Sequence, residues 1–397
     1  MTPPSGHDRR RIVRNSGFIL LSRVIDIVVT LGITPIVARY LGLEMFAFFA
    51  VISAVSMVLS PLADFGFERI VCREIAGDRR KADAYLNTAM VVRLCISILI
   101  VAGTLVAAKY WLVWNNSIKL ALVVSIASEL VWAAGMTYIA VIRAFERMEY
   151  ELLANFLFKL SWIVFICMAV YSDKGLVGVF MARLASAGIF LFLAAWFFYR
   201  KFGQLKFNPS RSTAWFILKE SYPLAAASVL LALMFRVDVF LLTSLSTKVD
   251  VALFEAPHRL ITQLQIFAVA ISLGLFPVFA RMHAAGSTDE LRRLYNNVHK
   301  FMVITGVGLS AILCAFSKPI VLLLFGHAFG ESAISCRMLA PTMVCLFILS
   351  LQNLYLTAIG RQALHAARLA FPSPASGQVV VEAPLPADLE SALAWFG

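Results

Sequence analysis

Long apolar blocks constrain this sequence more than any other feature. The hydrocarbon core of a bilayer is about 30 Å thick, so a helix needs roughly 20 apolar residues to cross it. Blocks of at least this length follow one another at approximately 16–40, 45–65, 86–110, 118–142, 150–171, 175–199, 215–244, 251–279, 300–325 and 334–359. Membrane strands are only about ten residues long and alternate in polarity. These continuous blocks therefore predict an all-α, polytopic membrane helical bundle of about ten transmembrane helices.

The composition excludes a soluble domain. Only 15% of the 397 residues are charged and 60% are hydrophobic, whereas soluble domains carry roughly 25% charged residues. The first apolar block is too long for the apolar core of a signal peptide, and no small-residue cleavage site follows it. We therefore expect the first helix to remain as a membrane anchor.

Basic residues divide unevenly between the two sides of the predicted bundle. The connectors on the side of the N-terminus carry 22 Lys and Arg residues, and the opposite connectors carry 7. Because cytoplasmic loops are rich in Lys and Arg, the N-terminus is predicted to be cytoplasmic, in a multi-pass protein of the bacterial inner membrane. The net charge of +12 then reflects topology and attraction to anionic membrane lipids. A nucleic-acid partner is not expected.

A loose internal repeat predicts two halves in the same orientation. Segments 67–92 and 275–304 each pass a glycine-containing turn, a basic pair, a tyrosine and an asparagine two residues later. Tyr85 and Tyr295 are 210 residues apart, an offset that spans six helices. Such parallel-repeat halves enclose a substrate path. The predicted organisation is a basic arm (1–15), a six-helix bundle (16–200), a linker (201–214), a four-helix second bundle (215–360) and a polar tail (361–397).

Several charged residues lie inside the predicted membrane segments. The basic ones are Arg23, Arg93, Lys159, Arg183, Arg236 and Arg259, and the acidic ones are Asp26, Glu129 and Asp238, with Glu255 nearer the outer end. A charge at the bilayer centre costs at least about 2.5–3.5 kcal/mol, so these residues indicate a wet, functional interior. The excess of basic residues predicts a cationic cavity for an anionic headgroup, because arginine fits phosphate oxygens bidentately. The six basic residues are the predicted substrate-binding residues, and Asp26, Glu129 and Asp238 are predicted to couple transport to protons or another ion.

Structural alternatives remain open for most of these charges. Arg93 and Lys159 are close enough to the cytoplasmic side to snorkel. Arg23 and Asp26 are spaced to neutralise each other on one helix face, and Glu255 and Arg259 have the spacing of an ordinary helical ion pair around His258 and Pro257. Two arginines have no well-placed acid on their own helix turn and are the best candidates to face a cavity: Arg183 and Arg236.

Motifs of catalysis are absent from the sequence. It contains no glycine-rich phosphate loop ending in GK[ST], no HExxH and no GxSxG. The six cysteines lie mostly in or beside apolar blocks and form no CxxC pair, which is typical of small buried or lipid-facing residues. We therefore expect a non-enzyme with no catalytic residues, no metal site and no cofactor.

Several ordered motifs resemble one family of membrane proteins. They are "PIVARYLGLEMFAFFAVISAV" (35–55), "LADFGFERIVCREIAGD" (62–78), "RAFERMEY" (143–150), "FEAPHRLITQL" (254–264) and "LFPVFARM" (275–282). Over residues 10–361 the chain resembles the polysaccharide (O-antigen, Wzx-type) flippases of the multidrug/oligosaccharidyl-lipid/polysaccharide (MOP) exporter superfamily.

This resemblance implies two six-helix bundles that alternate access. It also implies export of undecaprenyl-diphosphate-linked oligosaccharide, such as an O-antigen or exopolysaccharide repeat unit for lipopolysaccharide or polysaccharide biosynthesis, with other glycan-assembly membrane proteins as partners. Because the apolar blocks stop near Gly360, the second bundle is expected to have four helices and transport activity to be compromised.

The tail has a different character from the rest of the chain. In "RQALHAARLAF" and "VEAPLPADL" it resembles the C-terminal end of large-subunit ribosomal RNA pseudouridine synthases, without the catalytic aspartate region. We interpret residues 360–396 as a fragment of an unrelated gene joined near Gly360; an ordinary cytoplasmic tail is the alternative. A short hairpin around Ser376 and Gly377 is expected, without a core of its own.

Two other functions compete with oligosaccharide transport. A cation-coupled multidrug exporter of the same superfamily would need a predominantly acidic interior, opposite in sign to the one predicted. An intramembrane glycan polymerase or ligase would need long outer loops for sugar chemistry, and the predicted outer loops are short.

Overall fold

The computed structural model describes the backbone of residues 6–110, 113–202, 209–359, 368–371 and 379–382. Side chains are described for most of these residues from Val28 onward, and before it for Ser22, Ile25 and Asp26. The helices are α1 (Gly6–Asp64), α2 (Phe67–Gly77), η1 (Arg79–Lys81), α3 (Ala82–Tyr110), α4 (Asn116–Ala144), α5 (Met148–Tyr171), α6 (Gly175–Phe202), α7 (Arg211–Met234), α8 (Val237–Leu245), α9 (Lys248–Leu264), α10 (Ile266–Ala284), α11 (Thr288–Ala315), α12 (Ser317–Phe325), η2 (His327–Phe329), α13 (Ser332–Leu339) and α14 (Thr342–Ala358). Every predicted apolar block is helical, which confirms the polytopic helical bundle.

The number of membrane spans differs from the ten predicted. Among the described residues, eight helices are long and apolar enough to cross a membrane, and the bent pair α13 and α14 gives a ninth. The remaining difference arises because the first two apolar blocks lie in one element, α1, which is 59 residues long. At 1.5 Å per residue a straight helix of this length would extend roughly 90 Å, about three times the hydrocarbon thickness.

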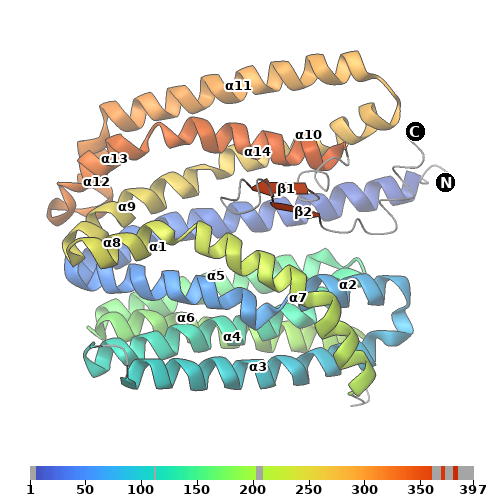
Figure 1. The fold of residues 1–397 in the computed structure, drawn as a ribbon, viewed down its shortest axis with the longest axis horizontal. Helices are drawn as coiled ribbons and strands as arrows, with labels where there is room; N and C mark the ends of the chain where they lie inside the picture. Colours follow the sequence, from blue (N-terminus) through green and yellow to red (C-terminus); the bar gives the residue numbers. More distant parts are fainter. Residues whose placement is uncertain (1–5, 111–112, 203–208, 360–367, 372–378, 383–397) are drawn as a thin grey trace. The chain divides into compact units, whose positions relative to one another are not determined.

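A backbone break at Gly42 explains how an element as long as α1 is accommodated. Gly42 has φ 67° and ψ 179°, inside what is otherwise helix on both sides, and α1 folds back on itself in Figure 1. The break lies between the predicted blocks 16–40 and 45–65, so each block forms its own arm of α1. These dihedral angles belong to a region that is essentially restricted to glycine.

Replacing Gly42 with alanine is therefore expected to destabilise the protein by about 1–3 kcal/mol through backbone strain alone. An added Cβ meets no atom within 4 Å at this position, so steric crowding does not contribute. Gly32→Ala is the matched control, because Gly32 is helical and also has open space around an added Cβ. Thermal unfolding in detergent measures both variants; equal midpoints for the two would contradict a strained break at Gly42.

The chain divides into two compact units. The first comprises residues 1–263 and 318–336, and the second comprises 264–317 and 337–397. In the first unit α4 lies against α6, and the two helices approach closely at Gly135, where an added Cβ would meet the Phe190 ring at 2.6 Å. Small residues at such crossings are typical of helix packing in membranes. The boundaries predicted from the sequence repeat remain a prediction.

In the second unit α14 packs against both α10 and α11 (Figure 1). Gly306 of α11 faces the backbone of Val344, and the rings of Tyr295 and Tyr355 lie 4.3 Å apart. The unit also contains an antiparallel strand pair, β1 (Arg368–Phe371) and β2 (Val379–Glu382). The two strands flank the predicted turn at residues 376–377, which itself lies outside the described residues, as does most of the tail.

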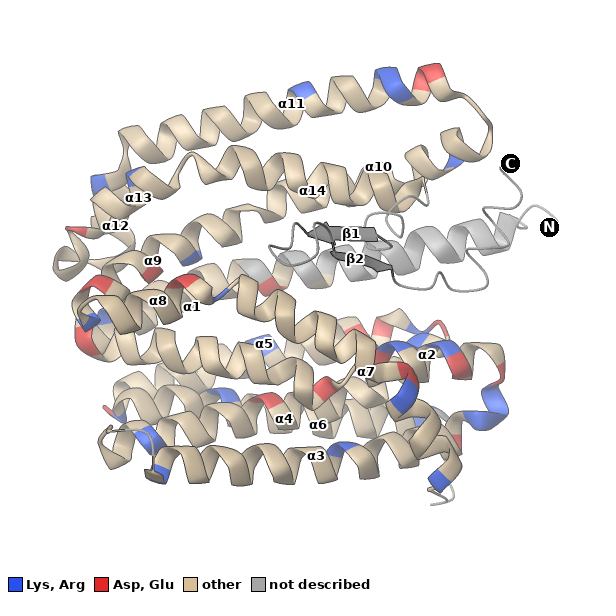
Figure 2. Ribbon diagram, in the orientation of Figure 1, with Lys and Arg blue, Asp and Glu red and all other residues tan. Residues whose placement is uncertain are grey.

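The surface of the helices is suited to lipid. Large apolar side chains such as Leu99 (71% exposed) and Phe192 (67% exposed) point outward from their helices. Figure 2 shows the charged positions of the first unit gathered mainly around α2 and at helix ends, with long uncharged stretches between. An apolar exterior of this kind is stable only against hydrocarbon, since water would penalise it. The chain is a multi-pass membrane protein.

Candidate functional site

Each described basic residue of the predicted interior has an acidic partner. The pairs are Arg93 with Asp64, Lys159 with Asp26, Arg183 with Glu129, and both Arg236 and Arg259 with Glu255. All of these residues belong to the first unit. The predicted site residue Arg23 lies outside the described side chains, so its role stays a prediction.

The first group of charges, here called the Trp162 cluster, gathers around one aromatic side chain. It consists of Asp26, Glu129, Lys159, Trp162 and Arg183. The Lys159 ammonium lies 4.9 Å and the Arg183 guanidinium 5.6 Å from the centre of the Trp162 ring, distances at which the ring face attracts a cation. The ring stands between the ion pairs Lys159–Asp26 and Arg183–Glu129. The cluster therefore ties α1, α4, α5 and α6 together.

A second group of charges, here called the Glu255 cluster, lies where helices are interrupted. It consists of Arg236, Asp238, Glu255, His258 and Arg259. Arg236 occupies the break between α7 and α8, and Pro257 stands inside α9 between the charged residues, where it removes a backbone donor. Glu255 is fully buried, and its Oε1 accepts from Arg236 at 3.1 Å and from Arg259 at 2.7 Å. The Glu255–Arg259 pair that the sequence spacing allowed is confirmed.

Aromatic and thioether groups of α1 border the Glu255 cluster. The Arg259 guanidinium lies 4.8 Å from the centre of the Phe49 ring, and Arg236 Nε approaches the Met57 sulfur at 3.2 Å. Arg259 also lies near enough to Arg183 of the Trp162 cluster for the two positive charges to repel each other. The two clusters thus form one charged array within the first unit.

The described interior charges are more evenly balanced than the sequence suggests. Arg93 is 2% exposed and pairs with Asp64, an acid that the sequence analysis did not place in the interior. Lys159 is 13% exposed and pairs with Asp26. From the sequence spacing, Arg23 was the possible partner of Asp26. The burial of Arg93 and Lys159 argues against the snorkelling alternative for both. Among the described interior charges, five basic residues therefore stand beside five acids once Asp238 is included.

A charged triad that the sequence analysis missed joins α2, α4 and α5. Arg143, assigned to a loop from the sequence, donates to both carboxylate oxygens of Glu151 at 2.6 and 2.5 Å and also pairs with Glu68. The only sequence signal for it was the spacing of Arg143 and Glu151 across the turn between two helices. The triad holds α2 against the bundle.

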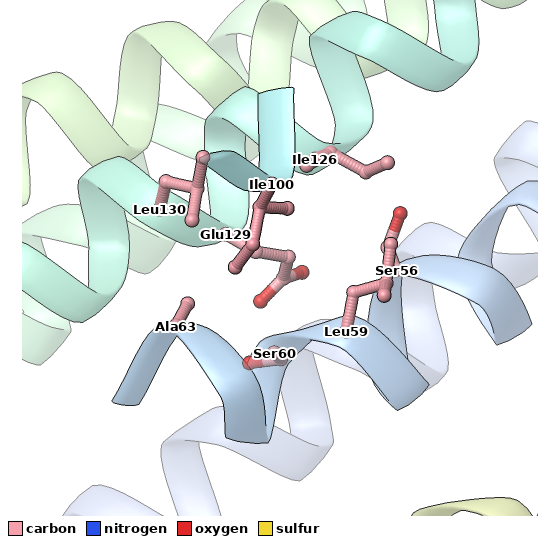
Figure 3. Close-up of a pocket in the computed structure, with 8 residues that line it drawn as sticks. All are labelled: Ser56, Leu59, Ser60, Ala63, Ile100, Ile126, Glu129 and Leu130. Carbon is pink, nitrogen blue, oxygen red and sulfur yellow. The ribbon is translucent and has the colours of Figure 1, made fainter. Parts of the chain in front are cut away.

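Figure 3 shows where the Glu129 carboxylate lies. It is one of eight residues around a small pocket, which receives Ser56 and Ser60 from α1 and Ile126 from α4. A second cavity of about 200 Å³ is lined by residues that include Asp64, Glu68, Trp132 and Ser228. These spaces place carboxylates of α1, α2 and α4 next to openings in the first unit. Among the described residues no group of His, Cys, Asp and Glu is arranged to hold a metal ion.

Solved structures of MATE transporters share this fold. The chain aligns with the inward-facing conformation of a multidrug resistance MATE family transporter of the MOP superfamily at a TM-score of 0.62 and 19% identity, over 86% of this chain and 81% of that chain. The outward-facing conformation of such a transporter gives 0.61 and 20%, over 88% and 82%. The Vibrio cholerae MATE transporter VcmN in its bent form gives 0.55 and 16%, over 89% and 84%.

Family profiles agree with the fold. The MatE profile matches residues 223–365, and together with the apolar helices and a second profile match it defines the class: a multi-pass membrane transporter of the MOP superfamily rather than an enzyme. The second profile, described as polysaccharide biosynthesis protein, matches residues 12–283. That match covers more than half of the chain, which belongs to this family. A search of curated proteins finds no match.

Proposed function

We propose that this transporter moves undecaprenyl-diphosphate-linked oligosaccharide across the bacterial inner membrane by alternating access, with its N-terminus in the cytoplasm. Membership of the polysaccharide biosynthesis protein family supports a glycan cargo. The observation that carries the proposal is the pairing of two guanidinium groups, Arg236 and Arg259, on one oxygen of the buried Glu255. The identity of the glycan and the partners among other glycan-assembly membrane proteins are proposals. Family membership does not assign them.

The Glu255 cluster includes an N–H donor that is free to bind a diphosphate oxygen. A guanidinium carries five N–H donors, yet Arg259 Nη2 is buried and has no hydrogen-bond partner among the described residues. A buried donor without an acceptor costs roughly 1–3 kcal/mol or more. Phosphate oxygens that reach this nitrogen would relieve that cost and would engage the planar fork of arginine. A diphosphate fits this chemistry better than a cationic drug does.

Binding in lipid nanodiscs tests this proposal. Wild-type protein is expected to bind undecaprenyl diphosphate at least about tenfold more tightly than undecaprenol, which corresponds to about 1.4 kcal/mol. The double variant Arg236→Gln/Arg259→Gln is expected to lose this preference. Arg200→Gln/Arg281→Gln is the matched control, because it removes the same charge from two exposed arginines. Equal binding of both lipids by wild-type protein would contradict the proposal.

The balance of acidic and basic residues among the described interior charges supports one alternative function. The solved relatives are described as multidrug resistance transporters, and the described interior acids equal the interior bases in number. A cation-coupled multidrug exporter would bind a cationic dye such as ethidium at the acids Asp26, Glu129 and Asp238. Competition in the same nanodiscs separates the two functions: displacement of ethidium by undecaprenyl diphosphate is not expected for an exporter of cations.

A further inference from the structure

We propose that His258 is a proton-binding site that switches the Glu255 cluster between a neutral and a cationic state. Both of its ring nitrogens face carboxylates. Nε2 lies 3.8 Å from Asp238 Oδ2, and Nδ1 lies 3.5 Å from Glu255 Oε2. The side chain is 21% exposed and its ring stacks on Phe254 at 5.6 Å between centres. The residue is thus held in place between two acids.

A neutral imidazole cannot satisfy both of these acids. It carries one N–H, so in either tautomer one ring nitrogen presents a lone pair to a carboxylate oxygen. Glu255 Oε2 and His258 Nδ1 are both buried and have no hydrogen-bond partner among the described residues. Adding one proton gives the ring a donor on each side, so the one unfavourable contact is removed and both contacts become charge-assisted. The geometry is therefore complete only when the imidazole is protonated.

The other charges of the Glu255 cluster determine its net charge before and after His258 is protonated. Asp238 comes from α8, Glu255 and Arg259 from α9, and Arg236 from the break before α8; α1 contributes the uncharged Phe49 and Met57. With neutral His258 the two arginines balance the two acids. With protonated His258 the cluster carries one net positive charge.

Protonation also changes how firmly Glu255 holds the arginines. A protonated ring attracts the same carboxylate that pairs with Arg236 and Arg259, so it competes with them for Glu255. The guanidinium groups are then freer to accept an anion. Because coupling between two ligands is reciprocal, an anion that binds these arginines also favours the protonated ring. This second part rests on the proposed function, since it takes a lipid diphosphate as the anion.

Histidine NMR spectra of the full chain in nanodiscs test the proton site directly. The resonance that disappears in His258→Gln is expected to show that the ring takes up a proton as the pH is lowered. Asp238→Asn retains the ring and removes one of its acids, so the same resonance is expected to titrate at more acidic pH. A His258 resonance that shows no uptake of a proton, or that is unaffected by Asp238→Asn, would overturn the proposal.

Binding at two pH values tests the coupling separately. Wild-type protein is expected to bind undecaprenyl diphosphate at least about threefold more tightly at pH 6 than at pH 8, beyond the change seen in His258→Gln, which reports the titration of the lipid itself. His283→Gln, at an exposed position of α10, is the control and should behave as wild type. A His258 that titrates without altering lipid affinity would overturn the coupling but keep the proton site. Absence of lipid binding at both pH values, with a titrating His258, would instead count against the proposed function.

Discussion

Substitution Glu255→Gln is expected to destabilise the protein by about 3–5 kcal/mol, because it leaves two arginines without their shared counter-charge. Glu255 is fully buried, and Arg236 and Arg259 are 17% and 16% exposed, so water cannot replace the lost carboxylate. Glutamine keeps the size of the side chain and one acceptor oxygen, so the effect reports charge and not packing. Thermal unfolding of purified protein in detergent, followed by size-exclusion chromatography, measures the loss.

Glu44→Gln is the matched control for this substitution. Glu44 pairs with Lys248 at 3.3 Å, but both side chains are more than half exposed. Exposed ion pairs contribute roughly 0–1 kcal/mol, so this variant should remain close to wild type. If Glu255→Gln and Glu44→Gln unfold at the same temperature, the buried carboxylate does not hold the two arginines together.

Substitution Arg143→Gln is expected to have the second largest effect, a loss of about 2–4 kcal/mol. It removes one cation from between Glu68 and Glu151, and the two acids then face each other without compensation. Arg143 is 24% exposed and Glu151 only 9%, so solvent screens the repulsion only in part. Since the triad joins α2 to α4 and α5, proteolysis near α2 should accelerate along with the loss of thermal stability.

Arg147→Gln provides the comparison on the same turn. Arg147 is 57% exposed, and its guanidinium pairs with Glu149 at 3.2 Å. Its removal is expected to change stability by less than about 1 kcal/mol. A loss as large as that of Arg143→Gln would mean that general charge on this turn matters, and not the triad.

The helical architecture could be predicted from the sequence because hydrocarbon leaves few choices. A block of apolar residues must satisfy its own backbone, and only a helix does so within one segment. For this reason all ten blocks were recognised, and the interval between the first two, around Gly42, coincides with the break in α1. The number of spans differs at this break, because the two arms of α1 on either side of Gly42 form one continuous helical element.

The partners of the buried charges could not be predicted in the same way. Sequence spacing identifies pairs on one helix, such as Glu255 and Arg259, because residues four apart share a face. Pairs between helices, such as Arg183 with Glu129 or Lys159 with Asp26, depend on how each helix is rotated and packed. The predicted excess of cations takes no account of Asp64, which pairs with Arg93 from a distant part of the sequence.

The balanced array changes how substrate binding would work. A cavity of free cations would bind a diphosphate by simple attraction, whereas paired arginines must exchange one anion for another. Such exchange lets the empty transporter keep its charges compensated in a medium of low dielectric constant. We propose that Glu255 is the internal anion that a lipid diphosphate displaces from the arginines. The protonation of His258 then sets how readily the diphosphate displaces Glu255.

Transport in proteoliposomes shows whether the protein moves lipid-linked oligosaccharide or cationic drugs. A fluorescent undecaprenyl-diphosphate-linked oligosaccharide is placed in one leaflet, and its appearance in the other is followed with a quencher that cannot cross the membrane. We expect movement with wild-type protein, none with Arg236→Gln/Arg259→Gln, and no transport of ethidium by either. Transport of ethidium by the wild-type protein, with the lipid-linked oligosaccharide remaining in its original leaflet, would contradict this expectation.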